Sequence, residues 1–165
     1  MTVVSAALGA SPSVGDSAPD FTLASTAGEK LTLSSLRGKP VLLAFFPLAF
    51  SSTCTAELCE MRDDHDEFVE RGVTVLPISV DSIYSLREYK AKHHYRVDFL
   101  SDFRRDVSRR YDVLLEDRFY SNRAYFLIDR DGIIRWKHVE VTPSHRRDDA
   151  QLFAAIDAAL YDGMR

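Results

Sequence analysis

Residues 41–59, VLLAFFPLAFSSTCTAELC, decide the fold of this chain. The run from Val41 to Phe46 is continuously apolar and lies between Pro40 and Pro47, which is typical of a short strand buried on both faces of a sheet. After Cys54 the apolar residues change to helical spacing. The stretch therefore predicts a central strand that leads through a loop into a helix, with Cys54 in the first turn of that helix.

The helix predicted after Cys54 is long and amphipathic. Charged residues fill the face opposite its apolar stripe, and Gly72 ends the run. A second apolar strand follows at residues 73–80, and Ser82 can cap the next helix. These elements form a βαβ unit followed by a further helix. The stripe consists of Leu58, Met61, His65 and Phe68.

Elements on either side of this unit predict a mixed sheet. Alternating residues around turn signals favour two hairpins, and other segments favour a short strand, a helix between the hairpins and a closing helix. Strands that alternate with helices, followed by a late antiparallel hairpin, predict an α/β fold with a mixed central sheet flanked by helices, as in the thioredoxin fold. The hairpins are expected at 18–33 and 124–136, the strand at 99–100, and the helices at 102–111 and 148–160.

Length and composition limit the classes of function. With 165 residues, 45% of them hydrophobic, the chain can bury one core, so we expect a flexible tail at 1–13 and a single domain at 14–165. A formal charge of −4 with scattered Lys and Arg argues against a nucleic-acid partner. No apolar run approaches the roughly 20 residues that cross a bilayer, and the start lacks the features of a secretory signal. We therefore expect no membrane partner and a cytoplasmic location.

The chain has two cysteines, Cys54 and Cys59. A static structural disulfide is not expected in a reducing compartment. Two thiols cannot complete a zinc site, and the five histidines lack metal-binding spacing. No metal or other cofactor is therefore expected, and redox chemistry or simple burial remains for the two thiols.

The surroundings of Cys54 favour a reactive thiolate. A free thiol has a pKa of about 8.5, so only about 3% is ionised at neutral pH. Unpaired N–H groups and the positive end of the helix dipole stabilise an anion in a first helical turn. Ser51 lies three residues earlier, and its hydroxyl can donate to sulfur and accept a hydrogen bond from a substrate. Pro47 can shield the loop, because it has no N–H that needs a partner.

Pro47, Ser51 and Cys54 match the Pro-x-x-x-Thr/Ser-x-x-Cys motif, and from about Val14 to Leu160 the chain resembles the peroxiredoxins. Three further segments support the likeness. The resemblance implies a thiol peroxidase with a thioredoxin-like fold that reduces hydrogen peroxide and organic hydroperoxides. It also implies that Cys54 is the peroxidatic cysteine, which becomes a sulfenic acid, while Ser51 and Arg123 orient the peroxide. The supporting segments are residues 18–23, residues 80–82 and Arg123 with the strand after it.

For Arg123, Glu57 and Phe50 the sequence also allows a simpler structural role. Arg123 considered alone would form a surface ion pair, and only the resemblance assigns it to the site. Glu57 is a common kind of first-turn carboxylate, stabilised by the helix dipole. Members of the bacterioferritin-comigratory and alkyl hydroperoxide reductase E kinds suggest instead that Glu57 contacts Arg123 or the substrate. Phe50 is expected in the core or in a pocket wall. At the substrate entrance, its apolar ring would favour organic hydroperoxides over hydrogen peroxide.

The sulfenic acid must be reduced before it oxidises further. Five helical residues separate Cys54 and Cys59 by about 7.5 Å and about 140°, so a disulfide requires the first turns to unwind. The resemblance to bacterioferritin-comigratory peroxiredoxins implies that Cys59 resolves the sulfenic acid, that thioredoxin or a similar thiol recycles the enzyme, and that the chain forms a homodimer. Two alternatives stay open: a one-cysteine peroxidase reduced directly by an external thiol, and a cysteine redox sensor without turnover.

Overall fold

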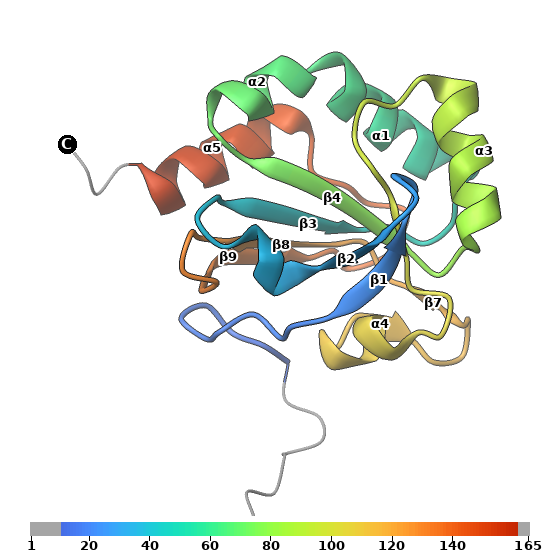
Figure 1. Ribbon diagram of the computed structural model, residues 1–165, viewed down its shortest axis with the longest axis horizontal. Coiled ribbons are helices and arrows are strands. Elements are labelled where there is room, and N and C mark those ends of the chain that lie inside the picture. The colour runs from blue at the N-terminus through green and yellow to red at the C-terminus, as the bar shows by residue number, and fades with distance from the viewer. Residues whose placement is uncertain (1–10, 162–165) are drawn as a thin grey trace, which may run out of the picture.

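The computed structural model describes residues 11–161, so most of the expected tail at 1–13 lies outside the described residues. A seven-stranded mixed sheet has the order β2-β1-β5-β4-β3-β8-β9 (Figure 1). Its strands are β1 (Thr22–Ser25), β2 (Lys30–Thr32), β3 (Val41–Phe45), β4 (Thr74–Ser79), β5 (Leu100–Ser101), β8 (Ala124–Ile128) and β9 (Ile134–Val139). The helices are η1 (Leu33–Leu36), α1 (Ser52–Asp63), α2 (His65–Glu70), α3 (Ile83–His93), α4 (Asp106–Arg110) and α5 (Asp149–Leu160).

Strand β3 lies inside the sheet, as its apolar sequence predicts. It pairs in parallel with β4 and antiparallel with β8, and all of its residues are buried. Strand β4 contains Pro77, which cannot donate a ladder hydrogen bond. The partner strand β5 begins opposite Ile78, so Pro77 pairs only with Ala44 of β3. The proline is therefore tolerated in an interior strand, because the neighbour on one side starts one residue later.

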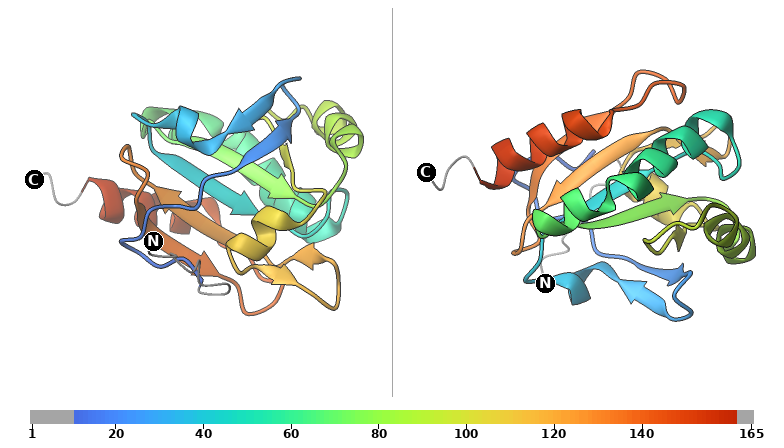
Figure 2. Two further views of the ribbon diagram at one scale, coloured as in Figure 1. Left: turned by 60° about the horizontal axis from the view of Figure 1, so that its bottom comes forward. Right: turned by 90° about the horizontal axis from the view of Figure 1, so that it is seen from above.

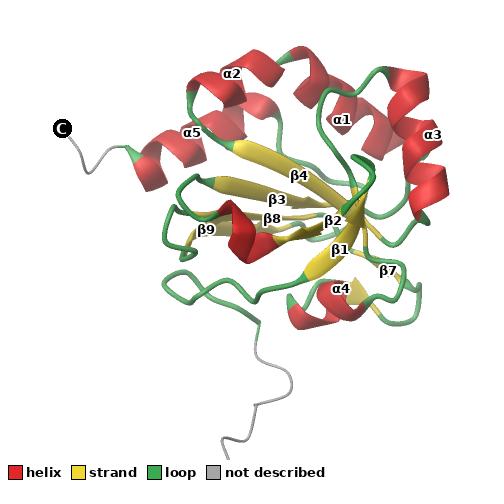
Figure 3. Ribbon diagram, in the orientation of Figure 1, coloured by secondary structure: helices red, strands yellow, loops and turns green. Residues whose placement is uncertain are grey.

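Helices cover both faces of the sheet, and a separate apolar core fills each layer. Helices α1, α2, α3 and α5 pack on one face through residues such as Leu58, Leu86 and Leu152 (Figures 1 and 2). Helix α4 and the short η1 cover the other face through residues such as Val107 and Leu33 (Figure 3). The mixed sheet flanked by helices that the sequence predicts is therefore present. Among the described residues, no helix is long and apolar enough to cross a membrane.

The long helix expected after Cys54 is divided in two. Asp64 leaves helical geometry at φ −94° and ψ 15°, so α1 ends at Asp63 and α2 begins at His65. Aspartate is favoured at helix boundaries, because its short side chain competes with helical hydrogen bonding. Glycine ends α2 as predicted, since Gly72 adopts a φ of +71°, which side chains disfavour.

Two other elements differ from the sequence prediction. Helix α4 begins at Asp106 rather than at Asp102, because the buried Asp102 carboxylate accepts the backbone N–H groups of Val107 and Ser108 at 3.1 and 2.7 Å. A small sheet of β6 (Leu114–Leu115) and β7 (Tyr120–Ser121) is also present, and its strands are too short for alternation to reveal. The hairpins, the closing helix and the strand near residue 100 agree with prediction within a few residues.

Candidate active site

Helix α1 begins beside the C-terminal end of β3 and carries Cys54 in its first turn. Ser51 is the N-cap residue, so Cys54 is the third helical residue, as expected. Its side chain is buried, with 1% of the residue exposed. The sulfur accepts a hydrogen bond from Nη2 of Arg123 at 3.1 Å. A cation therefore lies against the sulfur, in addition to the helix terminus that the sequence predicts.

Arg123 reaches the sulfur from the residue that precedes β8. Its side chain is 1% exposed, and its guanidinium is held by three different groups. Nη1 donates to Oε1 of Glu57 at 2.9 Å, while Nε and Nη2 donate to the carbonyl of Pro143 at 3.2 and 3.0 Å. The planar fork of an arginine suits such divided bonding, whereas a lysine offers one compact charge. The contact expected between Glu57 and Arg123 is therefore present.

Glu57 is held by a second partner from the sheet. The hydroxyl of Tyr125 donates to Oε2 of Glu57, and it accepts the backbone N–H of Arg147 at 3.1 Å. Burial raises the pKa of Tyr125, and the charge of Glu57 raises it further, so this phenol stays protonated as a donor. Burial also raises the pKa of Glu57, although Arg123 and Tyr125 oppose that shift.

Arg123 keeps its charge in this buried position. Burial lowers the pKa of its guanidinium, but the charges of Glu57 and Cys54 outweigh burial, and the pKa is raised. A buried ion pair costs desolvation, and removing one partner leaves an uncompensated charge. The pair therefore fixes a permanent cation whose N–H groups point at the sulfur, where they can stabilise negative charge on sulfur or oxygen.

The loop before α1 is shaped by hydrogen bonds and by one strained residue. Pro47 is buried at the end of β3, and the N–H of Ala49 donates to Oδ2 of Asp81 at 2.8 Å. The hydroxyl of Ser51 donates to the carbonyl of Leu48 at 2.9 Å rather than to the sulfur of Cys54 as the sequence predicts, because that carbonyl lies three residues earlier in the same loop. Its lone pairs can still accept a hydrogen bond from a substrate. Phe50 adopts a φ of +67°, which is unfavourable for a bulky residue and is typical of functional loops.

The ring of Phe50 lies outside both cores. The residue is 47% exposed, and its ring packs against Tyr89 with 4.8 Å between centroids. Nζ of Lys92 lies 5.7 Å from its centre, within the range of a cation–π contact. Tyr89 in turn shares a hydrogen bond of 2.9 Å with Oγ1 of Thr55 on α1. Phe50 is therefore a partly exposed wall beside the start of α1, rather than a core residue.

Cys59 lies farther along α1 and is partly buried. Its sulfur is 3.6 Å from the hydroxyl of Tyr95, within a weak hydrogen bond to sulfur. Both cysteines are free thiols, and α1 is intact from Ser52 to Asp63. The helix therefore separates the two sulfurs, as the spacing predicts.

Some residues of this network were not identified from the sequence. The position of Tyr125 could have been predicted from the sequence. It lies two residues after Arg123, and strand residues at that spacing share a face. Asp81 was noted only as part of the segment 80–82, and its contact with the loop requires the fold. The contact of the Pro143 carbonyl with Arg123 could not be predicted from the sequence. Every residue has a carbonyl, and only the path of the chain brings this one to Arg123.

Comparison with known proteins identifies the family to which this chain belongs. Residues 14–137 match the model of the AhpC/TSA family. The chain belongs to this family, the peroxiredoxins. This peroxiredoxin is 39% identical over 150 residues to the alkyl hydroperoxide reductase E of Mycobacterium bovis, covering 89% of this chain and 97% of that protein. It is 37% identical over 136 residues to a putative Bcp peroxiredoxin of Coxiella burnetii, covering 78% and 90% of the two chains.

Solved structures agree with this assignment. The reduced 2-Cys peroxiredoxin of Plasmodium vivax superposes with a TM-score of 0.81 at 32% identity, covering 88% of this peroxiredoxin and 80% of that chain. The peroxidoxin BcpB of Mycobacterium tuberculosis gives a TM-score of 0.79 at 28% identity, covering 89% and 97%. The fold is therefore thioredoxin-like, and this peroxiredoxin is a thiol-dependent hydroperoxide reductase of the Bcp type. Its family implies a hydroperoxide substrate and a thiol reductant.

Proposed function

We propose that Cys54 is the residue at which this peroxiredoxin reduces hydroperoxides, with Arg123 and Ser51 as its catalytic partners. The contact of 3.1 Å between the Cys54 sulfur and Nη2 of Arg123 carries the proposal. A sulfur lone pair attacks the terminal peroxide oxygen, the S–O bond forms and the O–O bond breaks. The leaving oxygen departs as hydroxide or alkoxide and takes a proton from solvent to give water or an alcohol, and Cys54 becomes a sulfenic acid.

Each partner has a defined task in this step. The Arg123 guanidinium balances the thiolate before the attack and can donate to the oxygens as charge moves onto them. The Ser51 hydroxyl accepts a hydrogen bond from the peroxide O–H, which orients the O–O bond along the line of attack. Glu57 is a positioning residue, because it holds Nη1 of Arg123 and does not contact the sulfur. Pro47 and Phe50 shape the entrance, and an apolar rim favours organic hydroperoxides over hydrogen peroxide.

Stopped-flow mixing with peroxide tests this assignment. Wild-type protein should lose one thiol in a fast bimolecular step, and Cys54→Ser should lose that step entirely. Cys59→Ser should keep it, which provides the matched control. A Cys54→Ser variant that still consumes peroxide at the wild-type rate would remove Cys54 from the mechanism.

We propose further that Cys59 resolves the sulfenic acid and that thioredoxin or a similar thiol reduces the resulting disulfide. The Cys59 thiol attacks the sulfenic sulfur, the S–S bond forms and water leaves. Helix α1 must first unwind, and helix ends open at low free-energy cost. Peptide mass mapping after one equivalent of peroxide should find a Cys54–Cys59 disulfide. A stable sulfenic acid or only intermolecular adducts would favour the one-cysteine mechanism.

Turnover separates the enzyme from a sensor of the same chemistry. With thioredoxin, its reductase and excess peroxide, a resolving peroxidase consumes many equivalents, whereas a sensor stops after one. A homodimer and a cytoplasmic location belong to the same proposal and rest on the likeness to Bcp peroxiredoxins. Sedimentation analysis at micromolar protein should give twice the chain mass, and cell fractionation tests the location.

A further inference from the structure

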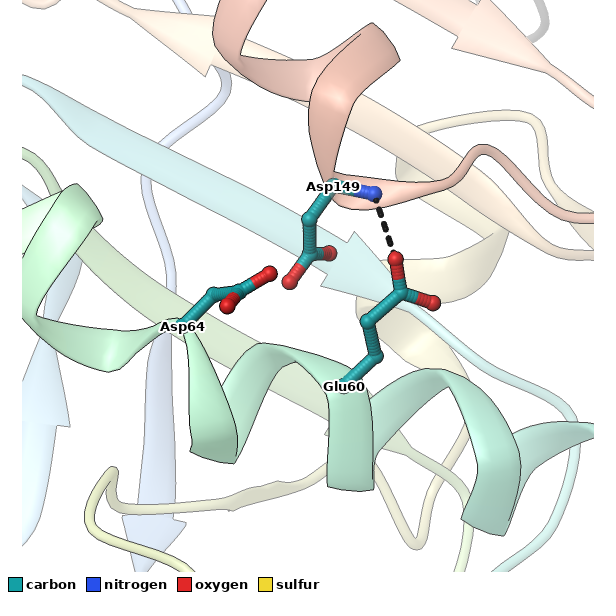
Figure 4. Close-up of side chains that lie close together, drawn as sticks. All are labelled: Glu60, Asp64 and Asp149. Carbon is teal, nitrogen blue, oxygen red and sulfur yellow. Dashed lines mark hydrogen bonds between the residues drawn. The ribbon is translucent and has the colours of Figure 1, made fainter.

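Three carboxylates meet where the end of α1 faces the start of α5. They belong to Glu60 on α1, Asp64 at the break between α1 and α2, and Asp149 in the first turn of α5 (Figure 4). One oxygen from each lies within 4.8 Å of the others. The site is separate from the cysteine network, because these three residues do not contact Cys54, Arg123 or Tyr125 through any hydrogen bond between the described side chains.

Asp149 is the unusual member of this cluster. The residue is 1% exposed, and neither of its carboxylate oxygens has a hydrogen-bond partner among the described residues. Figure 4 shows its carboxylate pointing toward that of Asp64, while the Glu60 carboxylate faces the backbone nitrogen of Asp149. A buried carboxylate without a partner is costly, so this position requires a positive ligand or a proton.

The charges around the cluster leave room for a divalent ion. Nη1 of Arg146 forms an ion pair with Oε2 of Glu60 and balances one of the three carboxylates. Oε1 of Glu60 accepts the backbone N–H of Asp149 at 3.0 Å and keeps a free lone pair. With Asp149 deprotonated on cation binding, two negative charges, on Asp64 and Asp149, would remain to be balanced. A cation of charge two would neutralise them.

We propose that Glu60, Asp64 and Asp149 bind a divalent cation that prefers oxygen ligands, of the Ca²⁺ class. All the donors are carboxylate oxygens, which suit hard cations and not thiolate-seeking or imidazole-seeking metals. Ca²⁺ fits better than Mg²⁺, because it accepts irregular geometry and a mixture of protein and water ligands. With three protein ligands and one nearby arginine, we expect a Kd on the order of 10⁻⁴ M, at the weak end for calcium sites.

The cation would tie the end of α1 to the segment that holds Arg123. Arg146 and Arg147 directly precede α5, and the N–H of Arg147 donates to Tyr125. The same segment contains Pro143, whose carbonyl holds the guanidinium of Arg123. A bound cation would therefore anchor the last turn of α1 while its first turns open during disulfide formation. This consequence depends on the proposed role of Cys54, but cation binding itself does not.

Calorimetric titration of the full chain tests the site. Protein stripped with a chelator and returned to chelator-free buffer at pH 7.5 is titrated with CaCl₂, and its Tm is measured with and without calcium. We expect saturable binding of one ion per chain and a rise in Tm of about 5 °C or more at 100 times the Kd. Asp64→Asn and Asp149→Asn should lose both effects.

Asp63→Asn is the matched control. Asp63 is exposed, adjoins Asp64 and pairs only with Arg62, so this variant should bind calcium like wild type. Absence of binding heat, or a Tm rise matched by NaCl of equal ionic strength, would overturn the proposal. Equal loss in the Asp63→Asn variant would overturn it too. None of these readouts uses peroxidase activity, so they remain valid if the assignment of Cys54 fails.

Discussion

Arg123 shows at the scale of one residue how geometry adds to charge. Its guanidinium contacts the sulfur of Cys54, the carboxylate of Glu57 and the carbonyl of Pro143 at the same time. The contact with the sulfur alone would be enough to place a positive charge beside it. The two others fix the plane of the fork, so that in the proposed attack by Cys54 the N–H group directed at the sulfur would require no reorganisation.

Replacing Arg123 by lysine separates geometry from charge. Arg123→Lys keeps the positive charge, but its compact ammonium lacks the planar fork whose separate nitrogens reach the sulfur, Glu57 and the Pro143 carbonyl at once, so the second-order rate constant with peroxide should fall by on the order of 10²-fold. Stopped-flow fluorescence measures that constant. Arg147→Lys is the control, because the Arg147 side chain pairs with Glu140 and makes no contact with the sulfur. A lysine variant as fast as wild type would mean that charge alone is sufficient.

Asp149 makes a second prediction at this scale, on the stability of the calcium-free protein. Its folded pKa of about 8 lies above the ordinary aspartate value of 3.8, so the folded state binds the extra proton between these two values. The stabilising proton is fully present below the unfolded pKa and is lost as pH rises through about 8. Stability should therefore fall with rising pH across that window, by at most about 1.4 kcal/mol per pH unit.

Urea denaturation at pH 5, 6, 7 and 8 in the presence of chelator measures this slope. Asp149→Asn does not titrate, so its stability should vary less with pH than that of wild type. Only the difference between the two proteins is informative, because other groups titrate in the same range. Parallel curves for wild type and variant would mean that Asp149 is already ionised in the folded protein.

At the scale of elements, α1 has two opposite requirements. Its first turn must be ordered to hold Cys54 against Arg123, yet the proposed disulfide with Cys59 requires that turn to open. The backbone before it is already extended, since Ser51 has φ −73° and ψ 151°. That conformation is the one a residue before proline prefers, and Ser52 is the exposed first helical residue.

Ser52→Pro should therefore stiffen the start of α1 without straining it. Proline at a compatible site stabilises by about 0.4–1 kcal/mol, so opening of the turn and disulfide formation should slow by about 2- to 5-fold. Oxidation of Cys54 to sulfenic acid needs the closed turn and should keep its rate. Rapid quenching followed by mass spectrometry resolves the two steps. Ser52→Ala is the control, and slowing of both steps alike would contradict the idea that only resolution needs unwinding.

The elements also show where sequence reasoning succeeds and where it fails. Strand β3 and the first turn of α1 were predictable, because an apolar run and a following helical period are local properties of residues 41–68. The break at Asp64 was not, since a single aspartate does not interrupt an amphipathic pattern. The residues of the candidate site divide in the same way, into those that a local motif predicts and those that only the fold brings together. Ser51 and Cys54 lie three residues apart on one motif, whereas the Pro143 carbonyl reaches Arg123 only through the path of a loop without periodicity.

For the whole molecule, stability depends on the two apolar cores on either side of one sheet. Leu127 of β8 is fully buried in the core under α1 and α5, so Leu127→Ala should leave a cavity and cost about 2–5 kcal/mol of the free energy of unfolding. Val141 is 88% exposed, so Val141→Ala should stay within about 0.5 kcal/mol of wild type. Urea denaturation followed by tryptophan fluorescence and by circular dichroism measures both. Coincident curves from the two probes would indicate that the cores unfold together, because they share the sheet. A Leu127→Ala variant as stable as wild type would mean that the strands and helices of this layer do not pack as described.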